Sequence, residues 1–154
     1  MAVARAPSLR ARAIKLLAMR EQSRSELLRK LAPHAESPEQ VHALLDSLEQ
    51  AGHLSEERFA QSLARRRAER YGRRFIAQEL DQHRVAADVA APILADLAVD
   101  ERSRAQAVWA RRFTQAPADL AERARQHRFL AQRGFDGETI AWVLRHAAAQ
   151  ERDA

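Results

Sequence analysis

Apolar residues recur at intervals of three and four along almost the whole chain, and this spacing constrains the fold more than any other feature. It places apolar side chains on one face of an α-helix, whereas a half-buried strand would need strict alternation. Short polar segments separate the periodic stretches. The pattern predicts nine helices, near residues 9–17, 24–31, 38–51, 55–70, 75–84, 87–98, 100–114, 119–133 and 138–150.

Residues at the expected helix boundaries agree with this prediction. Ser23 precedes Glu26 at the spacing of a capping box, in which each side chain bonds the backbone N–H of the other residue. Ser37 and Pro38 are typical of the start of a helix, and Gly52 is typical of the residue after one. Only four glycines occur in 154 residues, which leaves little material for β-hairpins or phosphate-binding loops.

The expected helices fall into register when the chain is compared with itself at a period of about 50 residues. Leu31, Leu80 and Leu130 coincide, and the next helix has its first apolar anchor nine or ten residues later in all three copies. Those anchors and the residues four positions beyond them are Val41, Val89 and Ile140, followed by Leu45, Ile93 and Leu144. Constant loop lengths favour tandem repeats over a single nine-helix globule.

We therefore expect an all-α protein, a tandem array of three three-helix repeats that is elongated and curved. The repeats are expected at residues 1–53, 54–99 and 100–154. A unit of about 50 residues buries only a small core by itself, so neighbouring repeats must also stabilise one another.

No residue pattern for catalysis is present. The chain has no Cys, which excludes thiol nucleophiles and thiolate metal ligands. None of the six His residues pairs with another at the helical spacing of a zinc hydrolase. Nucleotide-binding glycine motifs and a nucleophilic serine elbow are also absent. We expect no enzyme activity, no cofactor and no metal ion.

Neither end nor middle of the chain resembles a membrane segment. No stretch approaches the roughly 20 apolar residues that a transmembrane helix requires. Arg5, Arg10 and Arg12 lie near the N-terminus without the apolar run of a secretory signal between them. We expect a cytoplasmic protein that does not bind membranes and acts as a monomer.

Positive charge is concentrated in one segment. The chain has 26 Lys and Arg against 21 Asp and Glu, a net charge of +5, and 24 of the basic residues are Arg. Codon bias accounts for this total, because Ala is also over-used. The segment 65–74, however, carries +5 by itself. The candidate partner-binding or DNA-binding residues are Arg65, Arg66, Arg67, Arg70, Arg73 and Arg74.

Two interpretations of this segment are open. In the first, the arginines only complement the partial negative charge at a helix C-terminus. In the second, the helix end and the turn at Gly72 project into a groove beside the next repeat and bind an anionic partner. On a helix, Arg66 and Arg70 would continue the face of Phe59 and Leu63. Six cations exceed what the helix dipole needs, which favours binding.

Several short motifs, in order and at matching spacing from about residue 14 to residue 147, resemble the RecX family. They are Ser25-Glu26-Leu27-x-x-Lys30-Leu31, Gly52-x-Leu54-Ser55-x-x-x-Phe59-Ala60, Arg67, Gly72, Ile76, Glu79-Leu80, Arg133-Gly134-Phe135 and Ile140. The resemblance implies a non-enzymatic helical modulator that binds filaments of the RecA recombinase on single-stranded DNA. It also implies inhibition of strand exchange, ATP hydrolysis and repressor cleavage. The first repeat departs from the family with His34-Ala35-Glu36, so we expect a different turn there.

Another class of function is an autonomous DNA-binding protein, because three-helix units resemble helix-turn-helix modules whose last helix enters the major groove. The third helix of the first repeat contains Asp46 and Glu49, and that of the second contains Asp88 and Asp96. These acids argue against readout of base edges. A purely structural adaptor is a third alternative.

Overall fold

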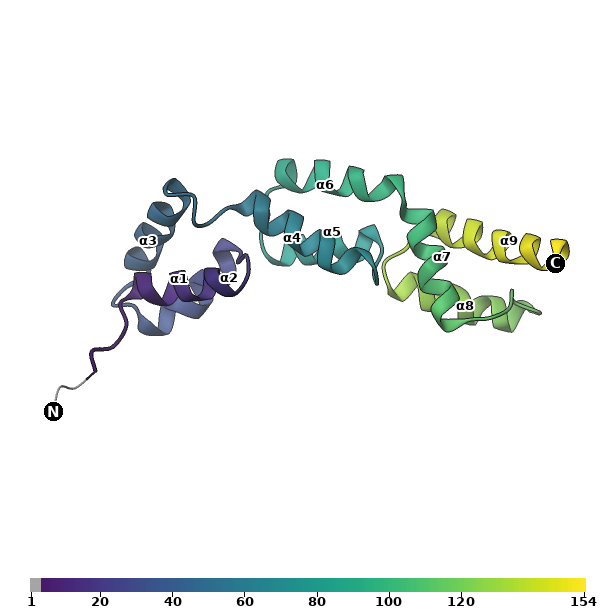
Figure 1. Ribbon diagram of the computed structural model, residues 1–154, viewed down its shortest axis with the longest axis horizontal. Coiled ribbons are helices and arrows are strands. Elements are labelled where there is room, and N and C mark those ends of the chain that lie inside the picture. Colours follow the sequence, from purple (N-terminus) through teal and green to yellow (C-terminus); the bar gives the residue numbers. More distant parts are fainter. Residues whose placement is uncertain (1–3) are drawn as a thin grey trace.

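The computed structural model describes residues 4–154 and arranges them as a row of three helical units (Figure 1). Over this range the chain forms nine α-helices, one short 3₁₀ helix and no strand. Their bounds are α1 (Leu9–Met19), α2 (Arg24–Leu31), η1 (Ala32–His34), α3 (Pro38–Gln50), α4 (Glu56–Ala68), α5 (Arg73–Gln82), α6 (Ala87–Val99), α7 (Glu101–Arg112), α8 (Leu120–Gln132) and α9 (Gly137–Asp153).

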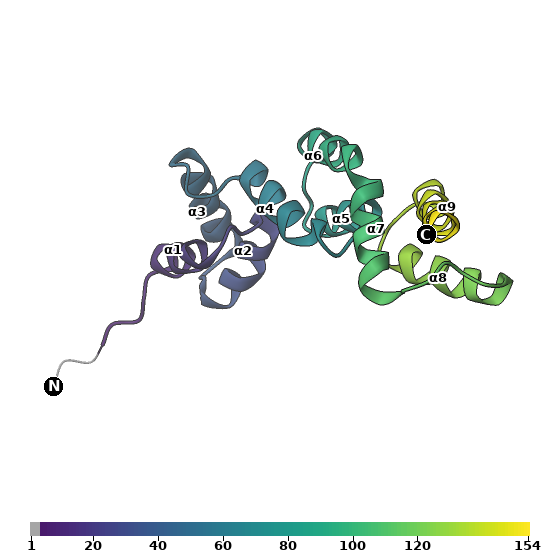
Figure 2. The ribbon, with the colours of Figure 1, turned by 45° about the vertical axis from the view of Figure 1, so that its right-hand side comes forward.

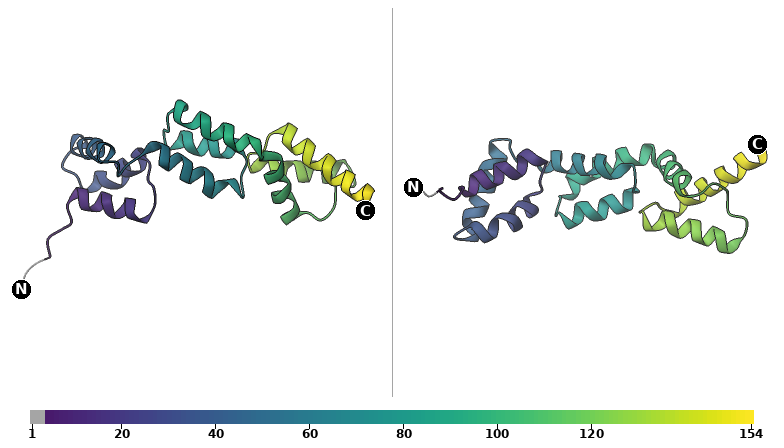
Figure 3. Two further views of the ribbon diagram at one scale, coloured as in Figure 1. Left: turned by 45° about the horizontal axis from the view of Figure 1, so that its top comes forward. Right: turned by 60° about the horizontal axis from the view of Figure 1, so that its bottom comes forward.

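Extensive helix–helix packing occurs inside each unit: among α1 to α3 in the first, α4 to α6 in the second and α7 to α9 in the third. Each unit has its own cluster of buried apolar side chains. The same elongated row is seen from other directions (Figures 2 and 3). The expected all-α array of three-helix repeats is thus confirmed. The boundaries at 53/54 and 99/100 stay a prediction.

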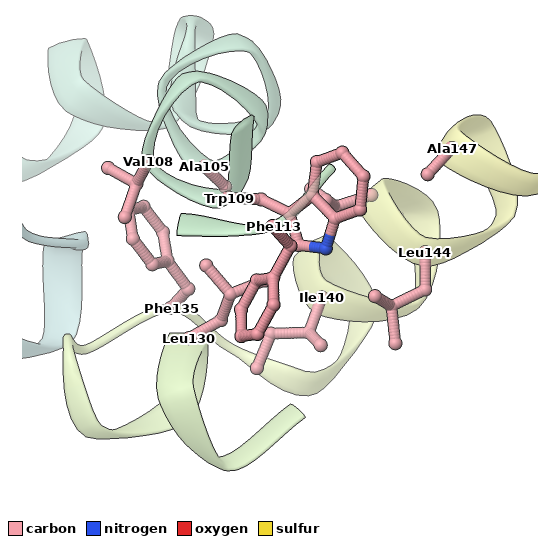
Figure 4. Close-up of a cluster of buried hydrophobic side chains, with 10 residues drawn as sticks. Ala105, Val108, Trp109, Phe113, Leu130, Phe135, Ile140, Leu144 and Ala147 are labelled. Atoms are coloured by element: carbon pink, nitrogen blue, oxygen red, sulfur yellow. The ribbon is translucent and has the colours of Figure 1, made fainter. Parts of the chain in front are cut away.

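The leucines that define the sequence period occupy equivalent buried positions. Leu31, Leu80 and Leu130 are each at most 1% exposed. In the third unit, Leu130 lies between Phe135 and Phe113, with Trp109 and Ile140 closing the core (Figure 4). Burial of a leucine stabilises a fold by about 1.5–3 kcal/mol, so these positions determine how each helix faces its neighbours.

Local capping determines most helix starts. The Ser23 hydroxyl accepts a hydrogen bond from the Glu26 N–H at 3.0 Å, and the Glu26 carboxylate accepts one from the Ser23 N–H at 3.4 Å. This is the predicted capping box.

The turn after the second helix of the first unit differs from its counterparts. After α2 the chain forms η1, and Ala35 is extended, whereas Arg84 and Gly134 adopt a positive φ at the corresponding turns. The first turn therefore differs from the other two, as expected.

The second unit departs from the sequence prediction at two helices. The helix expected to reach Arg70 ends at Ala68, because the N–H groups of Arg70 and Tyr71 both bond to the Arg67 carbonyl and close a turn. In α6 no residue is fully buried: the register anchors Val89 and Ile93 are half-buried, and Val99 is 88% exposed. This helix packs on α4 and α5 from one side only.

The first two units are joined by side-chain hydrogen bonds. The Ser23 hydroxyl lies 2.8 Å from His83 Nδ1, and the Ser25 hydroxyl donates to the His83 carbonyl at 3.0 Å. Arg58 donates to the Glu21 carboxylate at 2.9 Å. Each of these bonds depends on a side chain, and of those side chains only Ser23 is buried.

The second and third units are joined through their backbones. The Gly72 N–H donates to the Arg133 carbonyl at 2.7 Å, and the Arg74 N–H donates to the Gly134 carbonyl at 3.1 Å. Gly72 precedes α5 and has no side chain to cap it. The buried Glu101 carboxylate of α7 takes that role, accepting from the Arg73 N–H at 2.6 Å. The junction therefore completes a helix of the second unit with a residue of the third.

Candidate partner-binding surface

Two of the six arginines singled out by the sequence have partners within the protein. Arg67 forms two hydrogen bonds of 2.9 Å with the Glu79 carboxylate, which joins α4 to α5 and raises the pKa of the guanidinium. The Arg73 guanidinium lies 3.5 Å from Glu101 and 3.6 Å from Asp136, both in the third unit. These two side chains position the segment.

The C-terminal end of α4 is satisfied by arginines of the third unit. Arg104, whose side chain is only 12% exposed, donates to the carbonyls of Ala68 at 2.8 Å and Tyr71 at 3.0 Å. Arg111 donates to the Glu69 carbonyl at 2.6 Å. Helix-end carbonyls need such donors, and here they come from α7. The helix end therefore does not depend on hydrogen bonds from its own arginines.

The other four arginines, Arg65, Arg66, Arg70 and Arg74, are exposed, and within residues 4–154 their side chains form no ion pair or hydrogen bond. Arg66 and Arg70 were expected to continue the face of Phe59 and Leu63. Arg66 does so within α4, whereas Arg70 lies beyond the end of the helix at Ala68, and both side chains are exposed. The cationic groups are consequently available to a partner.

The turn at Gly72 does lie against the next repeat, and a cleft of about 400 Å³ opens beside it. Four arginines line the cleft: Arg70 from the second unit, with Arg111, Arg112 and Arg133 from the third. The other lining side chains are Tyr71, Val108 and Phe129. No carboxylate lines this cleft, so its walls combine positive charge with aromatic surface.

Sequence reasoning missed Arg104, Arg111, Arg112 and Arg133 as parts of this surface. A signal was present for two of them, because Arg111 and Arg112 form a second basic pair at the end of a helix. Arg133 belongs to the Arg133-Gly134-Phe135 motif, but the sequence does not show that this turn faces Gly72.

Other kinds of site find no support in the part of the chain that the structure describes. Among residues 4–154, no three His, Asp or Glu side chains come together in a way that could hold a metal ion. None of the described helices combines the length and hydropathy needed to cross a membrane.

The protein is a helical-repeat protein. Its three-helix units lie in a row, each unit has its own core, and an arginine-rich surface lies at the second junction. Family models of the RecX three-helix domains match the chain twice: the second domain at residues 55–92 and the third at residues 100–144. The regulatory protein RecX of Ralstonia nicotianae is 50% identical over 150 residues, covering 97% of this chain and 94% of that protein. RecX of one Neisseria meningitidis strain is 39% identical and covers 91% of both chains. The chain belongs to the RecX family of regulatory proteins.

Solved structures agree with the fold. The crystal structure of RecX from Lactobacillus salivarius superposes with a TM-score of 0.72 at 15% identity, covering 92% of this chain and 95% of that one. A second crystal structure of regulatory protein RecX gives a TM-score of 0.74 at 17% identity, covering 88% of this chain and 70% of that one. The three-helix array is therefore shared by proteins whose sequences have diverged widely.

Proposed function

We propose that this protein is a non-enzymatic cytoplasmic regulator that binds filaments of the RecA recombinase on single-stranded DNA and inhibits their recombinase, ATPase and coprotease activities. Membership of a family of regulatory proteins supports the regulatory role. The resemblance of its motifs to the RecX family implies that the partner is the RecA recombinase.

The main structural support is a set of exposed guanidinium groups in the second unit that have no ion-pair partner among the described residues. Arg65, Arg66, Arg70 and Arg74 are the proposed direct contacts, and Arg67 and Arg73 hold the segment in place. Arginine suits a nucleoprotein filament, because its planar fork binds protein carboxylates and DNA phosphates equally well.

The shape of the molecule suggests how binding changes filament activity. An elongated row of units can contact neighbouring protomers of a filament at the same time (Figure 1). A ligand that binds one filament geometry more tightly than others shifts the population toward that geometry. ATP hydrolysis and strand exchange by the recombinase then decrease, although the regulator itself catalyses no reaction.

The proposal is tested by measuring RecA-catalysed ATP hydrolysis on single-stranded DNA with increasing amounts of the protein. Inhibition is expected from the unaltered chain. A variant with Arg65, Arg66 and Arg74 changed to Ala should fold normally and inhibit at least about tenfold less effectively, because charge-assisted contacts are lost. Arg67 stays in place, since its removal would also break the contact with Glu79.

A matched control changes Arg29, Arg123 and Arg152 to Ala, which removes the same charge from exposed positions elsewhere. Equal loss in both triple variants would mean that only net charge matters. If the unaltered protein leaves ATP hydrolysis unchanged but binds one duplex sequence tightly, the autonomous DNA-binding alternative replaces the proposal. The acidic residues of α3 and α6 make that outcome unexpected.

A further inference from the structure

The cleft beside the Gly72 turn gathers positive charge from two units without any compensating acid. Arg70 comes from the turn after α4, Arg111 and Arg112 come from the end of α7, and Arg133 follows α8. Like charges gathered around one cleft repel one another. Ion pairs with carboxylates neutralise Arg67 and Arg73 nearby, but no carboxylate in the described part of the chain pairs with these four.

Contacts with uncharged groups hold three of the four guanidinium groups in place. Arg111 donates to the carbonyls of Glu69 at 2.6 Å and Ala107 at 3.3 Å. The Arg133 guanidinium lies 4.3 Å from the centre of the Phe129 ring, and that of Arg112 lies 5.4 Å from the centre of Phe113. Carbonyls and rings orient a cation while leaving its charge available. The cleft is therefore arranged in advance for an anion.

The walls of the cleft indicate which anion fits. Tyr71, stacked on Phe75 at 3.9 Å between ring centres, and Phe129 both line it, so a planar group can lie beside the cations. Alternating phosphates and planar bases characterise nucleic acid, and proteins that hold a single strand combine cationic grooves with aromatic surface. In a duplex the bases are stacked inside the helix, so a single strand is the form that can bring both phosphates and bases to these walls.

We propose that this cleft binds the phosphodiester backbone of single-stranded nucleic acid and that the bound strand connects the second and third units. The inference rests on the proposed function, in which single-stranded DNA is part of the filament, and adds where and how that strand is held. Arg70 supplies the contact from one unit, and Arg112 and Arg133 supply it from the other. The strand thereby reinforces the backbone junction at Gly72 and Gly134.

The test uses the full chain, no recombinase and a fluorescein-labelled oligonucleotide of about 20 thymidines, with binding followed by fluorescence anisotropy at several salt concentrations. Changing Arg112 and Arg133 to Ala should weaken binding about tenfold. Loss of two phosphate contacts should also make the slope of log K against log salt about 1.4 less steep, because each contact to a single strand contributes about 0.7.

A matched control changes Arg123 and Arg128 to Ala, two exposed arginines of α8 outside the cleft, and should bind the oligonucleotide within about twofold of the unaltered chain. Circular dichroism checks that both variants keep their helices. Equal weakening in both variants, or none in the cleft variant, overturns the inference. So does equally effective competition by poly-glutamate, which would show a site for protein carboxylates instead.

The ATP hydrolysis assay separates the two proposals. If the cleft variant keeps its affinity for the oligonucleotide and the unaltered chain still inhibits the filament, only the cleft inference is overturned. Specific oligonucleotide binding without any effect on the recombinase overturns only the proposed function.

Discussion

The backbones of Gly72 and Gly134 pack directly against each other where the second and third units meet. A Cβ atom built on Gly72 would lie 2.6 Å from the Phe135 nitrogen, and one on Gly134 would lie 2.9 Å from the Phe75 Cα. Gly134 also has a φ of +90°, a conformation that other residues adopt only with strain. Neither position accepts a side chain without moving the backbone of the opposite unit.

Changing Gly72 to Ala should destabilise this junction by about 1–3 kcal/mol, because backbone atoms must shift to admit the methyl group. Urea unfolding followed by the fluorescence of Trp109 and Trp142, both in the third unit, measures the loss. The matched control is Gly137→Ala, since a Cβ there meets nothing within 4 Å. Equal stability of the two variants would contradict the close packing described above.

Replacing Arg67 with Ala should lower the free energy of unfolding by about 1 kcal/mol, because a two-bond contact with Glu79 is lost from a pair that is partly open to solvent. The same change at Arg66 should have an effect within about 0.5 kcal/mol, since that side chain has no partner among residues 4–154. A double-mutant cycle of Arg67→Ala with Glu79→Ala isolates the pair energy. A coupling energy near zero would show that the contact does not stabilise the second unit.

The first unit should lose stability in acid through Glu26. Burial by itself raises the pKa of this carboxyl, but hydrogen bonds and charge from Arg20 and Lys30 outweigh burial and lower the pKa from 4.5 to about 2. Because the pKa is lower in the folded chain, the stabilisation is present above about pH 4.5 and is lost as the pH falls toward 2. The ionised Glu26 carboxylate stabilises the folded chain by roughly 3 kcal/mol.

Urea unfolding of the unaltered chain and of Glu26→Gln, followed by circular dichroism between pH 7 and pH 2, measures this contribution. The stability difference between the two proteins should be constant above pH 5 and shrink below about pH 4.5. A difference that stays the same down to pH 2 would contradict the lowered pKa.

The first junction should be looser than the second, because side-chain hydrogen bonds hold the first and backbone bonds with a buried carboxylate hold the second. The chain has no cysteine, so cysteines introduced in pairs carry spin labels without background labelling. Pulsed electron paramagnetic resonance should give a broader distance distribution for labels at Glu39 and Gln78 than for labels at Gln78 and Glu138.

Replacing His83 with Ala should broaden only the distribution across the first junction, since this ring forms the hydrogen bond with the Ser23 hydroxyl. His53→Ala is the control, because His53 is exposed and its side chain has no hydrogen-bond partner among the described residues. Equal broadening across both junctions would show that His83 acts on the whole array.

Features that depend on neighbours in sequence were predictable. The capping box of Ser23 and Glu26 is a contact between residues three apart, so spacing alone identifies it. The period that aligns Leu31, Leu80 and Leu130 identified three buried positions, because a repeated helix arrangement buries equivalent residues. The early end of α4 was missed, since Gly72 must be extended to meet the third unit and the chain turns before it.

By itself, the sequence determined the helices, their apolar faces and the concentration of arginine at residues 65–74, because all three follow from residue type and short-range spacing. Only the tertiary structure decided which arginines are free. Arg67 and Arg73 find carboxylates on other elements, while Arg70 joins Arg112 and Arg133 in one cleft. The physical reason is that partners distant in sequence meet only after the Gly72 and Gly134 backbones set the orientation of the second unit against the third.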